Sequence, residues 1–161
     1  MQGYAEAGRK GNIVEYINGC TFGCGSPRGF TQQEAWKESL RLMVESTGCD
    51  TVILPVVALQ DHAYSTQVDF ETPDVMSMDD VRNVCAYARE LGLRIIVKAM
   101  VNCRDGYWRA YIHFIDNYVP SEPTWGEWFE SYGRFVCELA KVAQEVNAEM
   151  YCIGCEMVGA D

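Results

Sequence analysis

Residues 77–101 read SMDDVRNVCAYARELGLRIIVKAMV, and they place a helix pattern directly before a strand pattern. Ser77 lies three residues before Asp80, which is typical of a helix N-cap, and Gly92 stands where a helix would end in a left-handed residue. Residues 93–101 are apolar on successive positions, which indicates a strand covered on both faces. Between Ser77 and Gly92, apolar side chains recur at the spacing of one helix face: Val81, Val84, Cys85, Ala88 and Leu91.

The same order of patterns recurs along the chain. Helix starts are indicated at Thr31 and Thr124, each three residues before a glutamate, and helix ends at Gly48 and Asn147. The order is therefore β-α-β-α-β-α-β, an α/β fold in which parallel strands are joined by right-handed crossovers. Such a sheet is either an open doubly wound sheet or the first half of a (β/α)8 TIM barrel. The apolar runs that indicate strands are residues 16–22, 51–57, 93–101 and 149–153.

Long connections follow the strands, whereas each helix returns to the next strand within a few residues. The longest are residues 58–76 and 102–123. Both candidate architectures place functional sites at the carboxyl ends of the strands, where these connections lie. The first connection, GCTFGCGSPRGF at residues 19–30, has neither G-x-G-x-x-G nor a P-loop lysine, so it does not predict a nucleotide site.

The composition is that of a globular protein, with 161 residues of which 48% are hydrophobic and 22% charged. This length suits one domain over residues 1–161, with a poorly defined N-terminal segment at residues 1–16. The net charge of −10 repels phosphate backbones and anionic lipids, so we expect neither nucleic acid nor membrane partners. Because there is no signal-peptide pattern and no apolar run that could span a bilayer, we expect a cytoplasmic protein.

The eight cysteines are spread through the predicted helices and strands. This favours buried free thiols in a reducing compartment over a disulfide framework. The alternative is a four-thiolate metal site, although its second pair lies in a strand pattern where residues three apart point to opposite faces. Neither H-x-H nor H-E-x-x-H occurs, so we expect no metal and no cofactor. The thiols of that alternative site are Cys20, Cys24, Cys152 and Cys155.

The sharpest candidate for chemistry is Glu156, which follows the last strand pattern in YCIGCEMVG at residues 151–159. A carboxylate that stands where a parallel strand emerges is partly desolvated. Burial disfavours the charged form, so we expect a raised pKa that suits a general acid. A solvated glutamate on a loop is the alternative interpretation.

Four short motifs follow one another along the chain: Val97-Lys98, Tyr107-Trp108-Arg109, Trp125-Gly126-Glu127-Trp128-Phe129-x-x-Tyr132 and Ile153-Gly154-Cys155-Glu156. In their order and spacing they resemble glycoside hydrolase family 113 and its relatives in the large retaining clan of (β/α)8 glycosidases. The resemblance runs from about Asn18 to Asp161. It implies an enzyme that hydrolyses β-1,4-linked glycans such as mannan or xylan.

In that clan the glutamate that ends the fourth strand is the general acid/base, and Glu156 occupies this position. The nucleophile is a second glutamate at the end of strand seven, which this chain does not reach, since a (β/α)8 barrel typically has about 250 residues. Retaining hydrolysis needs both carboxyl groups, about 5–5.5 Å apart. The resemblance therefore implies the N-terminal half of a retaining β-glycosidase, inactive as this fragment.

Two positions depart from the clan pattern. The residue before the acid/base is most often Asn and is here Cys155, and strand three often carries His where this chain has Met100. A thiol and a thioether are poor hydrogen-bond partners, so we expect an altered subsite around the cleaved bond.

Other strand ends are expected to supply a sugar-binding rim around Glu156. Asn102 offers an amide and Trp108 a flat apolar face for a pyranose ring, although Trp108 is alternatively a loop anchor packed on the helices. Lys98, inside a strand, is expected to pair with a carboxylate. The further substrate-binding candidates are Cys155, Gln60, Asp61, Arg28 and His62.

Three functional hypotheses remain. The first is the half-enzyme that acts on an oligosaccharide or polysaccharide, the second is a non-catalytic half-barrel that binds sugar or self-associates, and the third is the four-cysteine metal protein. Because a half-barrel leaves two strand edges unpaired, we expect the chain by itself to form a homo-oligomer.

Overall fold

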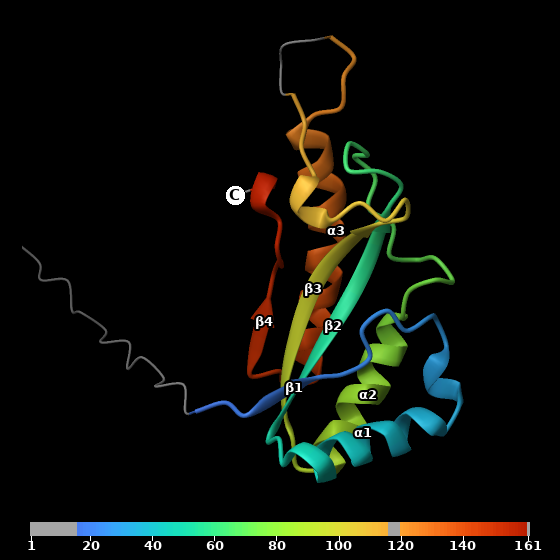
Figure 1. The fold of residues 1–161 in the computed structure, drawn as a ribbon, viewed down its shortest axis with the longest axis vertical. Helices are drawn as coiled ribbons and strands as arrows, with labels where there is room; N and C mark the ends of the chain where they lie inside the picture. The colour runs from blue at the N-terminus through green and yellow to red at the C-terminus, as the bar shows by residue number, and fades with distance from the viewer. Residues whose placement is uncertain (1–15, 116–119, 161) are drawn as a thin grey trace, which may run out of the picture.

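The computed structural model describes residues 16–115 and 120–160, whose strands form a parallel sheet (Figure 1). Each neighbouring pair of strands is parallel, which confirms the predicted β-α-β-α-β-α-β order. The N-terminal segment predicted at residues 1–16 lies outside the described residues, apart from Tyr16. The strands are β1 (Gly19–Thr21), β2 (Thr51–Gln60), β3 (Arg94–Cys103) and β4 (Met150–Cys152).

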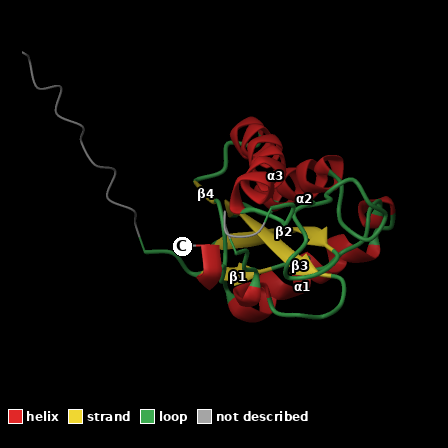
Figure 2. Ribbon diagram, turned by 90° about the horizontal axis from the view of Figure 1, so that it is seen from above, coloured by secondary structure: helices red, strands yellow, loops and turns green. Residues whose placement is uncertain are grey.

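The strands lie across the sheet in the order β1-β2-β3-β4, which is also their order along the chain. A doubly wound sheet reverses its strand order at a switch point, whereas a (β/α)8 barrel keeps the sequential order around its circumference. Figure 2 shows the helices arranged around the sheet, with β1 and β4 on opposite sides of the central strands. The fold is therefore a partial (β/α)8 barrel, and the open doubly wound alternative does not apply.

Two of the three predicted helix starts are confirmed. α2 begins with the capping box, in which the Ser77 hydroxyl accepts the Asp80 N–H and the Asp80 carboxylate accepts the Ser77 N–H. At the start of α3 the Thr124 hydroxyl accepts the Glu127 N–H. Within the described residues no helix is both long and apolar enough to cross a membrane. The helices are α1 (Ala35–Thr47), α2 (Met78–Glu90) and α3 (Trp125–Glu145), with short 3-10 helices η1 (Phe30–Gln32), η2 (Arg109–Tyr111) and η3 (Val158–Ala160).

The N-cap predicted at Thr31 is wrong. The helix α1 begins at Ala35, with Glu34 at the N-cap position and no side-chain cap. Thr31 lies in η1 instead, and its hydroxyl donates to Asp80 Oδ1 at 2.5 Å across 49 residues of sequence. A tertiary hydrogen bond has therefore replaced the local capping bond.

The predicted helix ends are confirmed by left-handed residues. The φ angles of Gly48, Gly92 and Asn147 are 64°, 76° and 52°, in the region where glycine and asparagine are favoured after a helix. These turns lead directly into the next strand, so the longer connections lie at the carboxyl ends of the strands.

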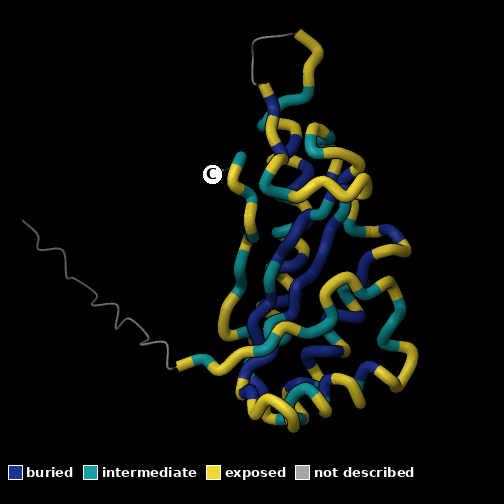
Figure 3. Tube along the Cα trace, in the orientation of Figure 1, coloured by how far each residue is buried: buried dark blue, intermediate teal, exposed yellow. Residues whose placement is uncertain are grey.

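The central strands are longer than predicted and the edge strands are shorter. β2 and β3 have ten residues each and stay in register from Thr51↔Arg94 to Gln60↔Cys103, whereas β1 and β4 have three each. The central strands are mostly buried and the edge strands are not (Figure 3). A central strand has neighbours on both sides, but an edge strand has one, so only part of each edge run pairs.

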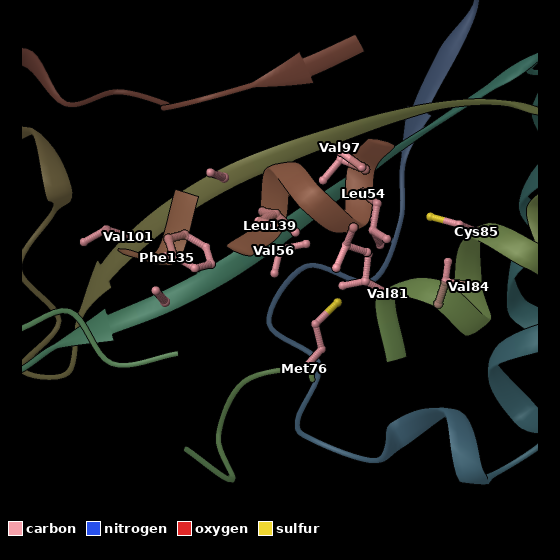
Figure 4. Close-up of a cluster of buried hydrophobic side chains, with 14 of the residues drawn as sticks. Leu54, Val56, Met76, Val81, Val84, Cys85, Val97, Val101, Phe135 and Leu139 are labelled. Atoms are coloured by element: carbon pink, nitrogen blue, oxygen red, sulfur yellow. The ribbon is translucent and has the colours of Figure 1, made fainter. Parts of the chain in front are cut away.

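The hydrophobic core lies between the sheet and the helices. Leu54 and Val56 of β2 and Val97 of β3 point toward side chains of α2 and α3 (Figure 4). Trp128 and Phe135 of α3 are fully buried in this layer. Because side chains alternate along a strand, the other face of β3 carries Lys98, Met100 and Asn102, the face that lines the interior of a (β/α)8 barrel.

Candidate active site

Glu156 lies beyond the carboxyl end of β4, which ends at Cys152. Its φ angle is 56°, a left-handed conformation that costs a non-glycine residue about 1–3 kcal/mol and clusters at functional sites. The backbone therefore places Glu156 in a conformation that the surrounding structure must maintain.

The loop that carries Glu156 is held at both ends. The Tyr132 hydroxyl on α3 donates to the Ile153 carbonyl. Burial raises the pKa of Tyr132 to about 12, so this hydroxyl stays protonated as a donor. At the other end η3 packs against η2, so closely that a Cβ at Gly159 would collide with the Ile112 carbonyl.

The carboxylate of Glu156 is held through one of its two oxygens. Oε2 accepts a hydrogen bond from Trp108 Nε1 at 3.0 Å and a second from Arg109 Nη1 in an ion pair. Among the described residues no donor reaches Oε1, and 51% of the side chain is exposed. One oxygen therefore fixes the position of the carboxylate, and the other is open to a ligand.

The raised pKa expected for Glu156 is not found. The hydrogen bond from Trp108 and the positive charge of Arg109 stabilise the carboxylate, and they lower the pKa of Glu156 below its ordinary value. The expectation assumed burial, but the side chain is half-exposed and desolvation is outweighed. Lys98 makes a smaller electrostatic contribution in the same direction, but among the described residues it forms no ion pair, so the carboxylate pairing expected for it is not found.

Arg109 organises this site, although it was not among the predicted site residues. Its Nε donates to the Val101 carbonyl at 2.9 Å, its Nη2 to Asn102 Oδ1 at 2.7 Å, and its Nη1 to Glu156. Only 12% of its side chain is exposed. The planar guanidinium thereby ties the end of β3 to the loop after β4. Its position directly after Trp108 in the sequence was the feature that could have identified Arg109 as a site residue.

The structure brings two predicted binding residues to Glu156. Trp108 donates directly to its carboxylate, and Asn102 is joined to it through Arg109. Trp108 is 50% exposed, so it is not the packed loop anchor of the alternative interpretation. Cys155 precedes Glu156 in the chain and is half-buried.

Gln60 has a different place from the one expected. It is 1% exposed at the end of β2. Its amide donates to the His62 carbonyl at 2.6 Å and accepts from Trp128 Nε1 at 2.8 Å. These contacts tie β2 to α3, and they do not support a direct contact between Gln60 and a sugar.

Arg28 and Asp61 also lie outside the immediate surroundings of Glu156. Arg28 donates to the Thr72 and Phe70 carbonyls and so fixes the connection between β2 and α2. Asp61 follows β2 and forms a long ion pair with Arg104 at 3.4 Å. Neither residue has a described contact with Glu156, Trp108 or Arg109.

The four-cysteine metal hypothesis is not supported. Cys20 and Cys152 lie on β1 and β4, the opposite edges of the sheet, and all eight cysteines are free thiols. No cluster of three or more potential metal ligands occurs in residues 16–115 and 120–160. The chemistry that the Glu156 geometry does offer is proton exchange between an open carboxyl oxygen and a bound ligand.

Comparison with known proteins gives a consistent result. Residues 20–161 match the sequence profile of Glycoside Hydrolase Family 113. A solved complex of a GH113 β-1,4-mannanase is 49% identical, with a TM-score of 0.89, and the match covers 91% of this chain and 48% of that chain. The GH113 β-mannanase AaManA from Alicyclobacillus acidocaldarius in complex with ManMIm is 32% identical, with a TM-score of 0.85, and the match covers 92% of this chain and 47% of that chain. No curated protein sequence matches.

Proposed function

The chain belongs to glycoside hydrolase family 113, and on this basis we propose that it forms the N-terminal half of a retaining β-glycosidase with Glu156 as the general acid/base. The chain spans about half the length of the solved mannanases that it matches. The observation that carries the role of Glu156 is the geometry of its carboxylate, in which Trp108 and Arg109 hold Oε2 and leave Oε1 open.

Retaining hydrolysis takes place in two steps that need two carboxyl groups. In the first step Glu156 donates its proton to the glycosidic oxygen, while a second carboxylate attacks the anomeric carbon. In the second step Glu156 takes a proton from the water that displaces the sugar from this covalent intermediate. We place the second carboxylate outside these 161 residues.

The lowered pKa of Glu156 keeps its carboxylate ionised, which is the form that can accept a proton in the second step. A general acid must instead be protonated near neutral pH. In the complete site, burial by a bound glycan and the negative charge of the second carboxylate both favour protonated Glu156. Once that carboxylate is bonded to the sugar its charge is lost, and the pKa of Glu156 falls again for the second step.

The subsite around the cleaved bond is proposed to use Asn102 and Trp108. Asn102 Oδ1 is taken by Arg109, and among the described residues its Nδ2 has no partner, so it can donate to a sugar hydroxyl. Trp108 offers a half-exposed ring for stacking on a pyranose. Cys155 and Met100 lack strong hydrogen-bonding groups, and we propose that they alter the sugar preference at this subsite.

The proposed substrate is a β-1,4-linked mannan, because the matched structures are named β-mannanases. The test is hydrolysis of defined glycans by the full-length protein that contains this chain. We expect release of reducing ends from β-1,4-mannan in excess of that from β-1,4-xylan, with full-length Glu156→Ala as the inactive control. Cleavage of neither glycan would contradict the proposal, and so would a product of inverted anomeric configuration.

A second function, that of a non-catalytic, self-associating half-barrel, is favoured for the isolated chain by apolar side chains near β4. Met150, Ile153 and Val158 are 37%, 68% and 66% exposed. Unpaired strand edges and apolar patches promote association, while the net charge of −10 opposes non-specific aggregation. Light scattering of the 161-residue chain at micromolar concentration should show a dimer or larger species without glycosidase activity. A compact, cooperatively unfolding monomer would contradict this proposal.

The cysteines bear on where the protein works. All eight are free thiols, and three of them, Cys49, Cys85 and Cys103, are buried. Because such thiols suit a reducing compartment, we propose a cytoplasmic location. Native disulfides detected by mass spectrometry of the unreduced protein would contradict it.

A further inference from the structure

Exposed aromatic side chains gather at the carboxyl end of the sheet, on the connections that follow β2 and β3. Tyr64 and Tyr107 are each 63% exposed, and Trp108 is 50% exposed. The rings of His62 and Tyr64 are stacked, with centroids 5.1 Å apart and an interplanar angle of 18°. Trp108 belongs to the Glu156 site, but the His62–Tyr64 pair has no part in it.

The stacked pair is held from the neighbouring connection. Asp105 Oδ2 lies 2.8 Å from His62 Nδ1, and Asp105 Oδ1 accepts the Tyr107 N–H at 3.0 Å. The backbone pairing of β2 and β3 also continues past their ends, where the Asp105 N–H donates to the Asp61 carbonyl at 3.3 Å. The hydrogen bond from His62 lowers the pKa of Asp105, which keeps this carboxylate ionised. The His62–Tyr64 pair is therefore preorganised at a junction of two connections.

An open hollow of about 310 Å³ lies beside the pair. Ser65, which lines it, accepts the His62 N–H at 3.0 Å. Arg104 also lines it, but this guanidinium is already paired with three carboxylates, so it offers no free positive charge to an anion. Gln60 lines it as well, but its amide is already bonded to His62 and Trp128. The other polar side chains of the lining are Asp61, Ser65, Thr66, Gln67, Asp69 and Arg104.

The chemistry of this place fits a neutral ligand with many hydroxyl groups. Amide, hydroxyl and carboxylate groups can bind hydroxyls as donors or acceptors, and an aromatic face covers the apolar face of a ring. The place lies at the same end of the sheet as Glu156, since the connection after β2 and the loop after β4 both follow the carboxyl ends of parallel strands. Asp105 also holds Tyr107, which precedes Trp108 of the Glu156 site. A glycan bound at Glu156 that extends across this end of the sheet reaches the connection after β2.

We propose that His62, Tyr64 and the hollow beside them form a distal subsite, which binds a sugar unit of the glycan away from the bond that is cleaved at Glu156. The proposal rests on the proposed glycosidase function and deepens it, because it gives the protein a preference for longer chains. Loss of one aromatic contact is expected to reduce that preference about two- to tenfold.

The test compares kcat/KM of the full-length protein for β-1,4-mannooligosaccharides of three to six units. In Tyr64→Ala the ratio of kcat/KM for mannohexaose to kcat/KM for mannotriose should fall about two- to tenfold. His62→Ala removes the other stacked ring and should act in the same direction. Tyr16→Ala is the matched control, because Tyr16 is an 86% exposed tyrosine that precedes β1, at the opposite end of the sheet. An unchanged ratio in both variants, or an equal loss at every chain length, would overturn the distal subsite.

Binding distinguishes failure of this subsite from failure of the proposed function. Full-length Glu156→Gln, with and without Tyr64→Ala, is titrated with mannotriose and mannohexaose by calorimetry. Tighter binding of the hexaose that Tyr64→Ala abolishes would support the subsite even if the wild-type protein cleaved no glycan. Equal affinity for the two sugars, or an advantage of the hexaose that survives Tyr64→Ala, would overturn the subsite even if the wild-type protein were an active mannanase.

Discussion

Two carboxylates, Asp80 at the start of α2 and Glu156 after β4, have opposite surroundings. Asp80 is 2% exposed, and both of its oxygens accept hydrogen bonds, which come from Gly29, Thr31 and Ser77. Burial opposes its ionisation, but these hydrogen bonds prevail and lower the pKa of Asp80 to about 2. Asp80 thus joins η1 to α2 as a fixed, ionised acceptor.

Glu156 is also an ionised acceptor, but only Oε2 is engaged by described residues, and the side chain is half-exposed. The comparison shows what separates a structural carboxylate from a candidate catalytic one. When both oxygens are saturated and buried, the group cannot meet a ligand. When one oxygen is held and the other is open, the group is positioned and can still exchange a proton.

The largest expected effect on stability follows substitution of Asp80. Asp80→Ala removes the capping box and leaves the part-buried donors of Gly29 and Thr31 without this acceptor. It should lower the free energy of unfolding of the full-length protein by about 2–4 kcal/mol, measured by urea denaturation. Asp79→Ala is the matched control, because the neighbouring Asp79 side chain is 88% exposed and should cost about 0.5 kcal/mol or less. Equal losses of stability in the two variants would contradict the structural role given to Asp80.

The contribution of the Asp80 carboxylate to the stability of the fold should also depend on pH. The pKa of Asp80 is about 2 in the folded chain and 3.8 as its ordinary value, so the unfolded state binds more protons between these limits. The stabilisation is therefore complete above the ordinary pKa and is lost as the pH falls through about 2, by about 2 kcal/mol. Unfolding measured between pH 5 and pH 2 should show this loss in the wild type and not in Asp80→Ala. Parallel losses would contradict the assignment.

A smaller effect, on activity, should follow substitution of Arg109. Arg109→Met removes the donor and the charge that hold Glu156, so kcat/KM of the full-length protein should fall by about tenfold. The pKa of Glu156 should rise, which moves the basic limb of the pH profile to higher pH. Arg109→Lys keeps the charge and should shift the limb less. A shift toward lower pH in Arg109→Met would contradict the role given to Arg109.

The local sequence predicted those parts of the fold that depend on local patterns. The long apolar runs of β2 and β3, the Ser77 capping box and the left-handed helix ends are formed by neighbouring residues. The Thr31 cap was wrong because its hydroxyl is taken by Asp80, far along the chain. The edge strands were overestimated because pairing depends on a neighbour that a sequence pattern does not reveal.

The grouping of residues at the candidate site was predicted from the sequence, but the contacts that hold them in place were not. Glu156, Trp108 and Asn102 were identified from their places after strands and in short motifs. The predicted rise of the Glu156 pKa was wrong, because the pKa is set by the hydrogen bond from Trp108, by Arg109 and by exposure rather than by the position after β4. Gln60 has the polarity of a sugar-binding residue, yet tertiary packing buries it against Trp128.

The role of Glu156 is tested most directly by the turnover of full-length Glu156→Gln on two substrates that differ in leaving group. For an unactivated mannooligosaccharide, turnover should fall about 10²–10⁴-fold, because the leaving oxygen receives no proton. An aryl β-mannoside with a good leaving group needs no acid in the first step, so it should give a rapid burst of phenol followed by a slow steady state that lacks the base. Near-native turnover of both substrates would contradict the assignment of Glu156 as the general acid/base.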